Sequence, residues 1–361
     1  MSNRKHNFCA GPCTLPTSVL EEMRDEFLDY QGAGLSLIEM SHRAPEYDAV
    51  HQEARRLALE VFGAPEDFDV LFIQGGAILQ FAMVAMNLLR PGERAGYVNT
   101  GAWAQGAIAD ARHYGDVYVA WDGAAGGYTR TPGDSEIEVR DGTRYLHITS
   151  NETIGGIRFP DFPAVDVPLV ADMSSELMAR PIPWDRFDLV YGGVQKNLGP
   201  AGMALVFIRK AVAAPANESI ARYLRYNVHL DKESLFNTPP MFTIAMVGKV
   251  LKWMKARGGL EVIEREAQDK AAILYRQIDE SDGFYRCPVH PASRSHMNVV
   301  FRLPSEALES RFLAESKSAD LLNLKGHRSV GGCRASIYNA MPRAGVEALA
   351  DFMQRFRDEH G

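Results

Sequence analysis

Short apolar runs alternate with longer amphipathic segments and glycine turns through the first two hundred residues of the chain. Seven runs have the length of buried β-strands, at residues 70–73, 95–98, 117–120, 145–149, 168–172, 189–191 and 203–208. Four segments have the apolar spacing of helices, at residues 17–30, 46–62, 77–89 and 101–114. This alternation predicts an α/β fold with a mostly parallel sheet.

The pattern changes after about residue 240. A long amphipathic stretch covers residues 242–275 and is broken at Gly258 and Gly259, and it is followed by strand-like runs at 297–303 and 334–338 and by a final helix at 345–357. This half reads as α+β. We therefore expect two domains, which is consistent with the chain length: a large domain at 16–255, and a smaller one built from 1–15 and 256–361.

Composition and charge exclude several function classes. The 361 residues carry a formal net charge of −7 and no cluster of basic residues, so neither nucleic acid nor a membrane surface is expected as a partner. No apolar run is long enough to span a membrane, and the N-terminal residues are too polar for a secretory signal. The four cysteines match no zinc spacing, so no metal is expected and a cytoplasmic protein with reduced thiols is favoured.

The stretch from Asp188 to Gly202 contains the first candidate for chemistry. Lys196 lies between two apolar runs, in a loop that several glycines keep tight. Burial lowers the pKa of an amine, and a neutral amine can attack a carbonyl carbon. From this stretch alone, a lysine exposed at the mouth of a loop is an equally good interpretation.

Other residues fall at the predicted carboxyl ends of strands, where open parallel sheets bind ligands. Asp172 ends a strand, and we expect one strand–helix–strand excursion between it and Lys196. The turn at Gly75, Gly76 and Ala77 opens a helix, so its free N–H groups suit a phosphate, although two glycines before a helix more often serve packing. A lysine, a carboxylate and a phosphate cradle together suit pyridoxal 5′-phosphate (PLP).

Seven motifs along the chain also resemble those of the phosphoserine aminotransferases, a family of class V within the PLP-dependent transferases of fold type I. They are Asn-Phe-Cys-Ala-Gly-Pro (7–12), Met-Ser-His-Arg (40–43), Ser-Asn-Glu-Thr-Ile-Gly-Gly (150–156), Asp-Met-Ser-Ser (172–175), Gln-Lys-Asn-Leu-Gly-Pro-Ala-Gly (195–202), Asn-Thr-Pro-Pro (237–240) and Gly-His-Arg-Ser-Val-Gly-Gly-Cys-Arg-Ala-Ser-Ile-Tyr-Asn-Ala (326–340). The last motif is long and specific to that family.

The resemblance implies how PLP would be held. Lys196 would form the Schiff base and move the proton in catalysis, while Asp172 would pair with the pyridine nitrogen. The remaining cofactor ligands would be Gly76, Ala77 and Gln195 at the phosphate, Trp103 on the ring face, Thr153 near the phenolic oxygen, and Asn237 and Thr238 from the other subunit of a homodimer. Without the resemblance, Trp103 would be read as a core residue and Thr153 as a loop hydroxyl bonded to its own backbone.

The resemblance also implies the substrate ligands. Arg334 would hold the α-carboxylate with a bidentate bond. A distal anion pocket would comprise His42 and Arg43 from the partner subunit, together with His327 and Arg328. One position departs from some members of the family, which carry an arginine where this chain has Ile78, so the phosphate pocket rests on fewer cations.

The implied reaction exchanges an amino group between O-phospho-L-serine and 2-oxoglutarate, giving 3-phosphooxypyruvate and L-glutamate. It belongs to serine biosynthesis, with the phosphohydroxythreonine intermediate of pyridoxine biosynthesis as a related substrate. The rival interpretations are an alanine–glyoxylate-type aminotransferase, a cysteine desulfurase and a catalytically silent PLP-fold binding protein. Cys333 is poorly placed for a desulfurase, and a nucleotide-binding protein would need a complete GxGxxG or P-loop spacing.

Overall fold

A seven-stranded sheet forms the centre of the protein in the computed structural model, which describes residues 4–215 and 217–361. In spatial order its strands are β2 (Phe68–Gln74), β10 (Met203–Arg209), β9 (Phe187–Gly193), β8 (Leu169–Asp172), β5 (Thr143–Thr149), β3 (Arg94–Asn99) and β4 (Asp116–Asp122). β10 is antiparallel to β2 and β9, and the other neighbouring pairs are parallel. The predicted mostly parallel α/β sheet is confirmed.

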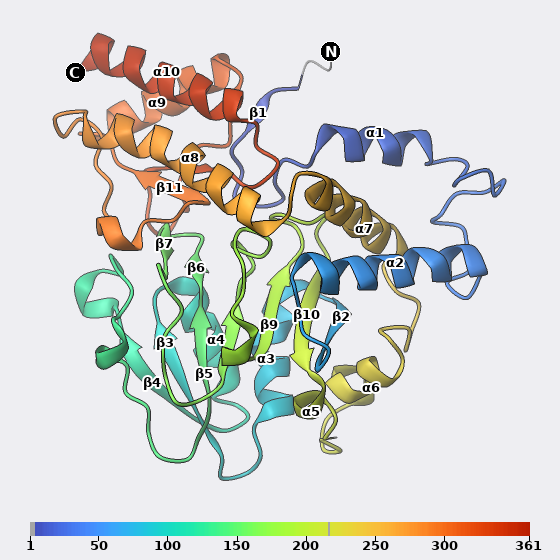
Figure 1. The fold of residues 1–361 in the computed structure, drawn as a ribbon. Coiled ribbons are helices and arrows are strands. Elements are labelled where there is room, and N and C mark those ends of the chain that lie inside the picture. Colours follow the sequence, from blue (N-terminus) through green and yellow to red (C-terminus); the bar gives the residue numbers. More distant parts are fainter. Residues whose placement is uncertain (1–3, 216) are drawn as a thin grey trace.

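Helices cover both faces of this sheet, because its central strands are buried on both sides (Figure 1). One hydrophobic core joins the sheet to α1 (Thr17–Asp25), α2 (Pro45–Val61) and α7 (Met241–Ala256). The other joins it to α3 (Gly76–Leu88), α4 (Ala102–Ala111), α5 (Lys210–Ala213) and α6 (Tyr226–Asp231). The sheet is therefore rigidly supported, and its strand ends can hold a site.

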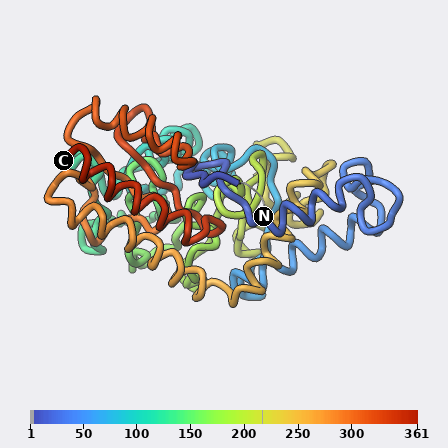
Figure 2. The backbone as a smooth tube through the Cα atoms, turned by 90° about the horizontal axis from the view of Figure 1, so that it is seen from above, coloured from blue at the N-terminus to red at the C-terminus, as the bar shows by residue number. Residues whose placement is uncertain are grey.

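A separate hydrophobic core lies in the last hundred residues. It combines the antiparallel pair β11 (Asn298–Phe301) and β13 (Cys333–Ser336) with α9 (Glu306–Ser318), α10 (Arg343–His360) and the second half of α8 (Leu260–Asp279). The N-terminal segment reaches the same core, because β1 (His6–Asn7) pairs with β12 (Leu321–Leu322). Seen from above, the C-terminal helices lie at one end of the molecule and the loop after α1 at the other (Figure 2). This second core supports the proposed two-domain division.

Three local predictions were wrong. The first helix ends at Asp25, and Phe27 and Leu28 beyond it are exposed. The segment between β8 and β9 has a short 3-10 turn and no α-helix, since Pro181 and Pro183 interrupt it. The predicted loop at 150–158 contains a small hairpin, in which β6 (Asn151–Glu152) pairs with β7 (Ile157–Arg158).

Among the described residues, none of the helices combines the length and the apolar character of a membrane span.

Candidate active site

The strand ends converge on a cavity of about 200 Å³ at one edge of the sheet. Its walls include six of the nine predicted cofactor ligands: Gly76, Ala77, Trp103, Asp172, Gln195 and Lys196. Topology explains the convergence, because β2, β8 and β9 all end at this edge and the segments after them turn inward. Residues that are far apart in sequence therefore share one pocket.

Lys196 lies in the connection between β9 and β10 and is only 8% exposed. Its Nζ donates a hydrogen bond of 2.6 Å to Oγ1 of Thr153. Burial lowers the pKa of Lys196 to about 8, although the nearby charges of Asp172 and Glu152 act in the opposite direction. The amine is thus partly neutral near neutral pH and can act as a nucleophile. The burial rules out a lysine exposed at the mouth of the loop.

Asp172 is buried at the end of β8. Its Oδ1 accepts hydrogen bonds from the backbone N–H and the hydroxyl of Ser174, at 2.8 and 2.6 Å. Burial raises the pKa of Asp172, while the charge of Lys196 and the bonds from Ser174 lower it. Both bonds from Ser174 reach Oδ1, so Oδ2 remains free to pair with a cationic ring nitrogen.

The start of α3 forms the anion-binding wall of the cavity. Gly75 and Gly76 have φ angles of 101° and 69°, a left-handed conformation that glycine adopts without strain. This turn aims the unpaired first N–H groups of α3 at the cavity, where the positive end of the helix dipole favours a phosphate. Gln195 also lines this cavity, and its side-chain amide nitrogen can donate a hydrogen bond to a phosphate.

These residues fit PLP. The cavity offers a helix N-terminus for the phosphate, a carboxylate for the pyridine nitrogen and an amine for the aldehyde carbon. The ring of Trp103 has its centroid 5.6 Å from Nζ of Lys196, so it can cover a planar ligand joined to that lysine. The phosphate, the pyridine nitrogen and the aldehyde carbon of PLP would thus each have a suitable binding group in the cavity wall.

Sequence reasoning missed Glu152, which lies close to the same site. Its buried carboxylate accepts hydrogen bonds from the backbone N–H groups of Trp103 and Ala104, at 3.3 and 2.9 Å. Burial raises the pKa of Glu152 to about 7, against the effect of these bonds. It thereby holds the first turn of α4 and the Trp103 backbone in place. Its position after strand β5, like that of Asp172 at the end of β8, was a signal for its location but not for these backbone partners.

A second cavity of about 400 Å³ lies next to the first, on the side of the C-terminal domain. Glu152 and Ile154 line it, whereas Thr153 between them contacts Lys196. Arg334 also lines this cavity and donates from Nη1 to the carbonyl oxygen of Thr153 at 3.2 Å. Among the described residues Arg334 forms no ion pair with a carboxylate. Its charge is therefore available to an anionic substrate.

Besides Thr153, His327 and Arg328, four predicted residues line neither cavity: His42, Arg43, Asn237 and Thr238. They gather beside the end of β2, where Oγ1 of Thr238 lies 3.4 Å from Nδ1 of His42 and Nδ2 of Asn237 donates to Oε1 of Gln74 at 3.3 Å. Arg43 is exposed beside them. Within a single chain, this surface group does not complete the pocket around Lys196.

His327 and Arg328 belong to a loop that lines the larger cavity, although neither residue lines it itself. Their loop lines the larger cavity through its neighbouring residues Gly326, Ser329, Val330 and Gly331, whereas their own side chains are not part of the cavity wall. Arg328 is exposed and His327 is half-buried. Within the single chain the loop lines the larger cavity, but these two side chains do not line the cavity around Lys196.

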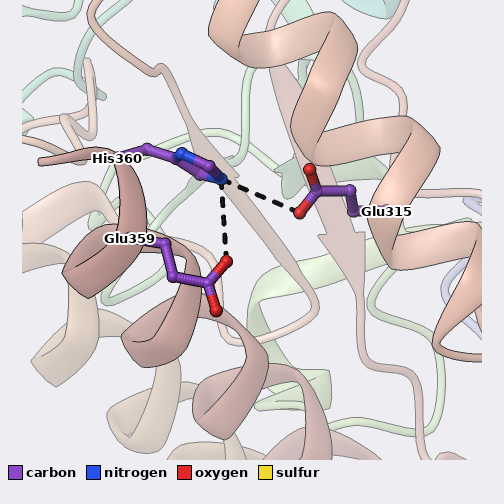
Figure 3. Close-up of side chains that lie close together, drawn as sticks. All are labelled: Glu315, Glu359 and His360. Carbon is purple, nitrogen blue, oxygen red and sulfur yellow. Dashed lines mark ion pairs between the residues drawn. The ribbon is translucent and has the colours of Figure 1, made fainter.

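One further cluster of ionisable groups lies outside both cavities. Nε2 of His360, on α10, is 3.9 Å from a carboxylate oxygen of Glu315 on α9 and 3.8 Å from one of Glu359 (Figure 3). These distances exceed those of direct hydrogen bonds. The ring of His360 packs against Phe356, with the two centroids 4.4 Å apart. The cluster joins two helices of the C-terminal domain and has no contact with the cavity walls.

Comparison with known proteins agrees with this geometry. The family model for class V aminotransferases matches residues 6–349. A phosphoserine aminotransferase from Niallia circulans is 49% identical to the chain, over the full length of both. The solved phosphoserine aminotransferase from Bacillus circulans subsp. alkalophilus superimposes with a TM-score of 0.98 at 49% identity, with both chains fully covered.

A more distant solved structure, the PLP-bound phosphoserine aminotransferase from Trichomonas vaginalis, has a TM-score of 0.93 at 32% identity, covering 97% of this chain and 100% of that one. The predicted PLP-dependent transferase fold of type I is therefore confirmed. The chain belongs to the phosphoserine aminotransferase family, within the class V aminotransferases.

Proposed function

We propose that the protein transfers an amino group between O-phospho-L-serine and 2-oxoglutarate, giving 3-phosphooxypyruvate and L-glutamate, with PLP as its cofactor. The observation that carries this proposal is the pair of Lys196 and Asp172 facing one small cavity, in a chain similar over its full length to phosphoserine aminotransferases. The reaction belongs to serine biosynthesis. By its chemistry, the related phosphohydroxythreonine of pyridoxine biosynthesis is a second substrate.

The roles of the residues around PLP follow from their positions. When bound, PLP supplies an electron sink that stabilises the negative charge left when an amino acid loses its Cα proton. Lys196, with its lowered pKa, takes that proton and returns one to the cofactor side. Asp172 holds a proton on the ring nitrogen, since its buried carboxylate favours a cationic partner. The N-terminus of α3 and Gln195 hold the phosphate.

The substrate has its own ligands in the larger cavity. Arg334 binds the α-carboxylate, because its guanidinium lines the cavity and has no carboxylate partner among the described residues. His327 and Arg328 receive the phosphate of phosphoserine or the side-chain carboxylate of glutamate. The phosphate of phosphoserine and the side-chain carboxylate of glutamate are thereby bound at the same place, at the end of the substrate far from the Cα–H bond that breaks.

We also propose a homodimer in which each site receives residues from the partner subunit. The support is that His42, Arg43, Asn237 and Thr238 lie together near the surface and do not line the pocket of their own chain. Ile78, which lines the small cavity, is 61% exposed, so this wall of the cavity is accessible to a partner chain. Light scattering behind a sizing column tests the proposal: a particle of one chain's mass would refute it.

The division at 16–255, with 1–15 and 256–361 as the second domain, remains our proposal, and the separate C-terminal core supports it. We place the enzyme in the cytoplasm. All four of its cysteines are free in the structure, as expected in a reducing compartment.

The test of the reaction is a half-reaction with the PLP-loaded protein. O-phospho-L-serine, added without 2-oxoglutarate, should abolish the visible absorption band, and 2-oxoglutarate should then restore it. L-alanine and L-serine serve as controls, because neither carries a distal anion. A fast response to L-alanine with none to O-phospho-L-serine would favour the alanine–glyoxylate type instead. No response to any amino acid would indicate a silent binding protein.

A further inference from the structure

The loop at residues 326–332 forms part of the wall of the larger cavity. Its neck is closed by a hydrogen bond from the N–H of Gly326 to the carbonyl of Gly332, at 2.8 Å. An isolated β-bridge between Lys325 and Cys333 continues the pairing below that neck. The two ends of the loop are therefore held together where it leaves the C-terminal domain. These bonds do not fix the tip of the loop, which needs other contacts to hold its conformation.

Arg302 supplies such contacts from outside the loop. Its backbone is fixed by a reciprocal pair of hydrogen bonds with Arg286, at 2.9 and 3.0 Å. From this anchor the guanidinium reaches the loop, with Nη1 donating to the carbonyl of Gly331 at 2.6 Å and Nη2 donating to the carbonyl of Val330. Two N–H groups of one planar fork thus hold two successive carbonyls.

The position of Gly332 shows how closely the guanidinium fits. A Cβ at that residue would lie 1.6 Å from Nη1 of Arg302, a separation that no pair of atoms tolerates. Gly332 also has a φ of 65°, in the left-handed region. A glycine is therefore required here both by the backbone and by the arginine.

The peptide unit between Val330 and Gly331 connects the guanidinium of Arg302 to the backbone of His327. Its carbonyl accepts from Arg302, and its N–H, that of Gly331, donates to the carbonyl of His327 at 2.8 Å. The N–H of Val330 donates to the same carbonyl at 3.0 Å. The backbone of His327 is thus fixed by the peptide that Arg302 holds.

The imidazole of His327 is oriented within the same loop. Its Nδ1 accepts from the N–H of Ser329 at 3.3 Å and lies 2.7 Å from the Ser329 hydroxyl. An accepting Nδ1 places the proton of the neutral ring on Nε2. The other edge of the ring is then a hydrogen-bond donor, which suits an oxyanion.

We propose that Arg302 is a positioning residue for substrate specificity: it holds the 326–332 loop in the conformation that presents His327 and Arg328 to the distal oxyanion of the substrate. This inference rests on the proposed function. Arg302 itself lines the larger cavity, but its role is indirect, because the two N–H groups directed at the loop are already bonded to carbonyls. This role requires the forked guanidinium, which can bond two carbonyls at once, and a positive charge alone is not sufficient for it.

The first test compares Arg302→Lys and Arg302→Met with the wild type in single-turnover half-reactions. We expect kcat/KM for O-phospho-L-serine to fall about tenfold to a hundredfold in both variants, mainly through KM, because lysine cannot bridge two carbonyls. L-Alanine, which lacks a distal anion, should react as it does with the wild type. Arg286→Met is the matched control, since its side chain bonds only to the carbonyl of Gly283.

Two outcomes of this test would overturn the proposal. Wild-type kcat/KM in Arg302→Lys would show that charge alone is needed. An equal loss for L-alanine would show a general structural defect. A visible absorption band of wild-type intensity in each variant would establish that the PLP site remains folded.

The second test reads the loop directly in the PLP-loaded protein. Trypsin should cleave after Arg328 faster in Arg302→Met than in the wild type or in Arg286→Met, because the unheld loop opens more often. A cleavage rate in Arg302→Met equal to that of the wild type would refute the proposal that Arg302 fixes the loop. Since this readout needs no substrate, it is informative even if O-phospho-L-serine gives no half-reaction, an outcome that would refute the proposed function alone.

Discussion

Two groups of candidate site residues are held in very different ways. Lys196 and Asp172 are buried, and each is hydrogen-bonded to a neighbouring residue, Lys196 to Thr153 and Asp172 to Ser174. His42 and Thr238 lie on irregular surface segments, and the 3.4 Å contact between them is longer than most hydrogen bonds. The sheet positions the first group, whereas the second group does not line the pocket of its own chain.

The difference separates two physical tasks. Cofactor chemistry needs groups whose pKa values are shifted by burial, and only the interior of a rigid sheet provides that. Recognition of a distal anion needs charges that stay ionised until the substrate arrives, so they remain near the surface. A second subunit placed over the pocket would supply those charges without burying them permanently.

The largest effect expected is that of Lys196→Ala. Losing the amine removes both the bond to PLP and the proton carrier, so the rate should fall by about 10²–10⁴-fold or more. The visible absorption band should disappear in the same variant. Lys317→Ala, on the exposed side of α9, is the control and should retain both. A surviving visible band would place the reactive amine elsewhere.

Asp172→Asn should have the next largest effect. Asparagine keeps an acceptor for Ser174 but removes the buried charge that faces the ring nitrogen. Loss of one partner from a buried charge pair costs about 2–5 kcal/mol, so we expect the half-reaction to slow by about 10²–10³-fold. The visible absorption band should remain, although shifted. A rate within threefold of wild type would mean that the ring nitrogen needs no carboxylate.

A complementation experiment compares the two groups directly. Lys196→Ala and Arg43→Ala should each be nearly inactive as homodimers, whereas co-expressed chains should regain about a quarter of the wild-type activity. Half of the dimers would be hybrids, and each hybrid would have one site that combines an intact Lys196 with an intact Arg43 from the other chain. If Arg43 served its own subunit, no activity would return.

The smallest effect concerns pH. Burial lowers the pKa of Lys196 to about 8, so the neutral amine of the cofactor-free protein should become available more than two pH units earlier than in free lysine, whose pKa is about 10.4. Reductive methylation of Lys196, followed by mass spectrometry, should accelerate up to about pH 8 and then level off. Nα-acetyl-lysine is the reference. A rate that climbs steadily to pH 10 would contradict the shift.

Much of the fold could be predicted because the central strands are apolar and bounded by glycine turns, as at β2 and β9. The carboxyl-end rule for parallel sheets also found Asp172 and Lys196, and the structure brings them together. Periodicity cannot show strand direction, so the antiparallel setting of β10 could not be predicted in this way. The absence of a helix before β9 depended on Pro181 and Pro183.

Glu152 escaped prediction for another reason. Its role depends on the backbone N–H groups of Trp103 and Ala104, which lie about fifty residues earlier in the chain. A sequence pattern records side chains and does not record which backbone groups a side chain will meet. The same limit applies to Arg302, whose partners are the carbonyls of Val330 and Gly331.

The short connection that carries Lys196 has a consequence for folding. It joins two strands that pair directly with each other, β9 and β10, so little chain entropy is lost when they meet. β2, which pairs with the other edge of β10, must come from more than a hundred residues earlier. We therefore expect the hairpin with the reactive lysine to form early, before the distant walls of its pocket arrive. The nascent chain would then expose this amine until β2 and α3 close over it.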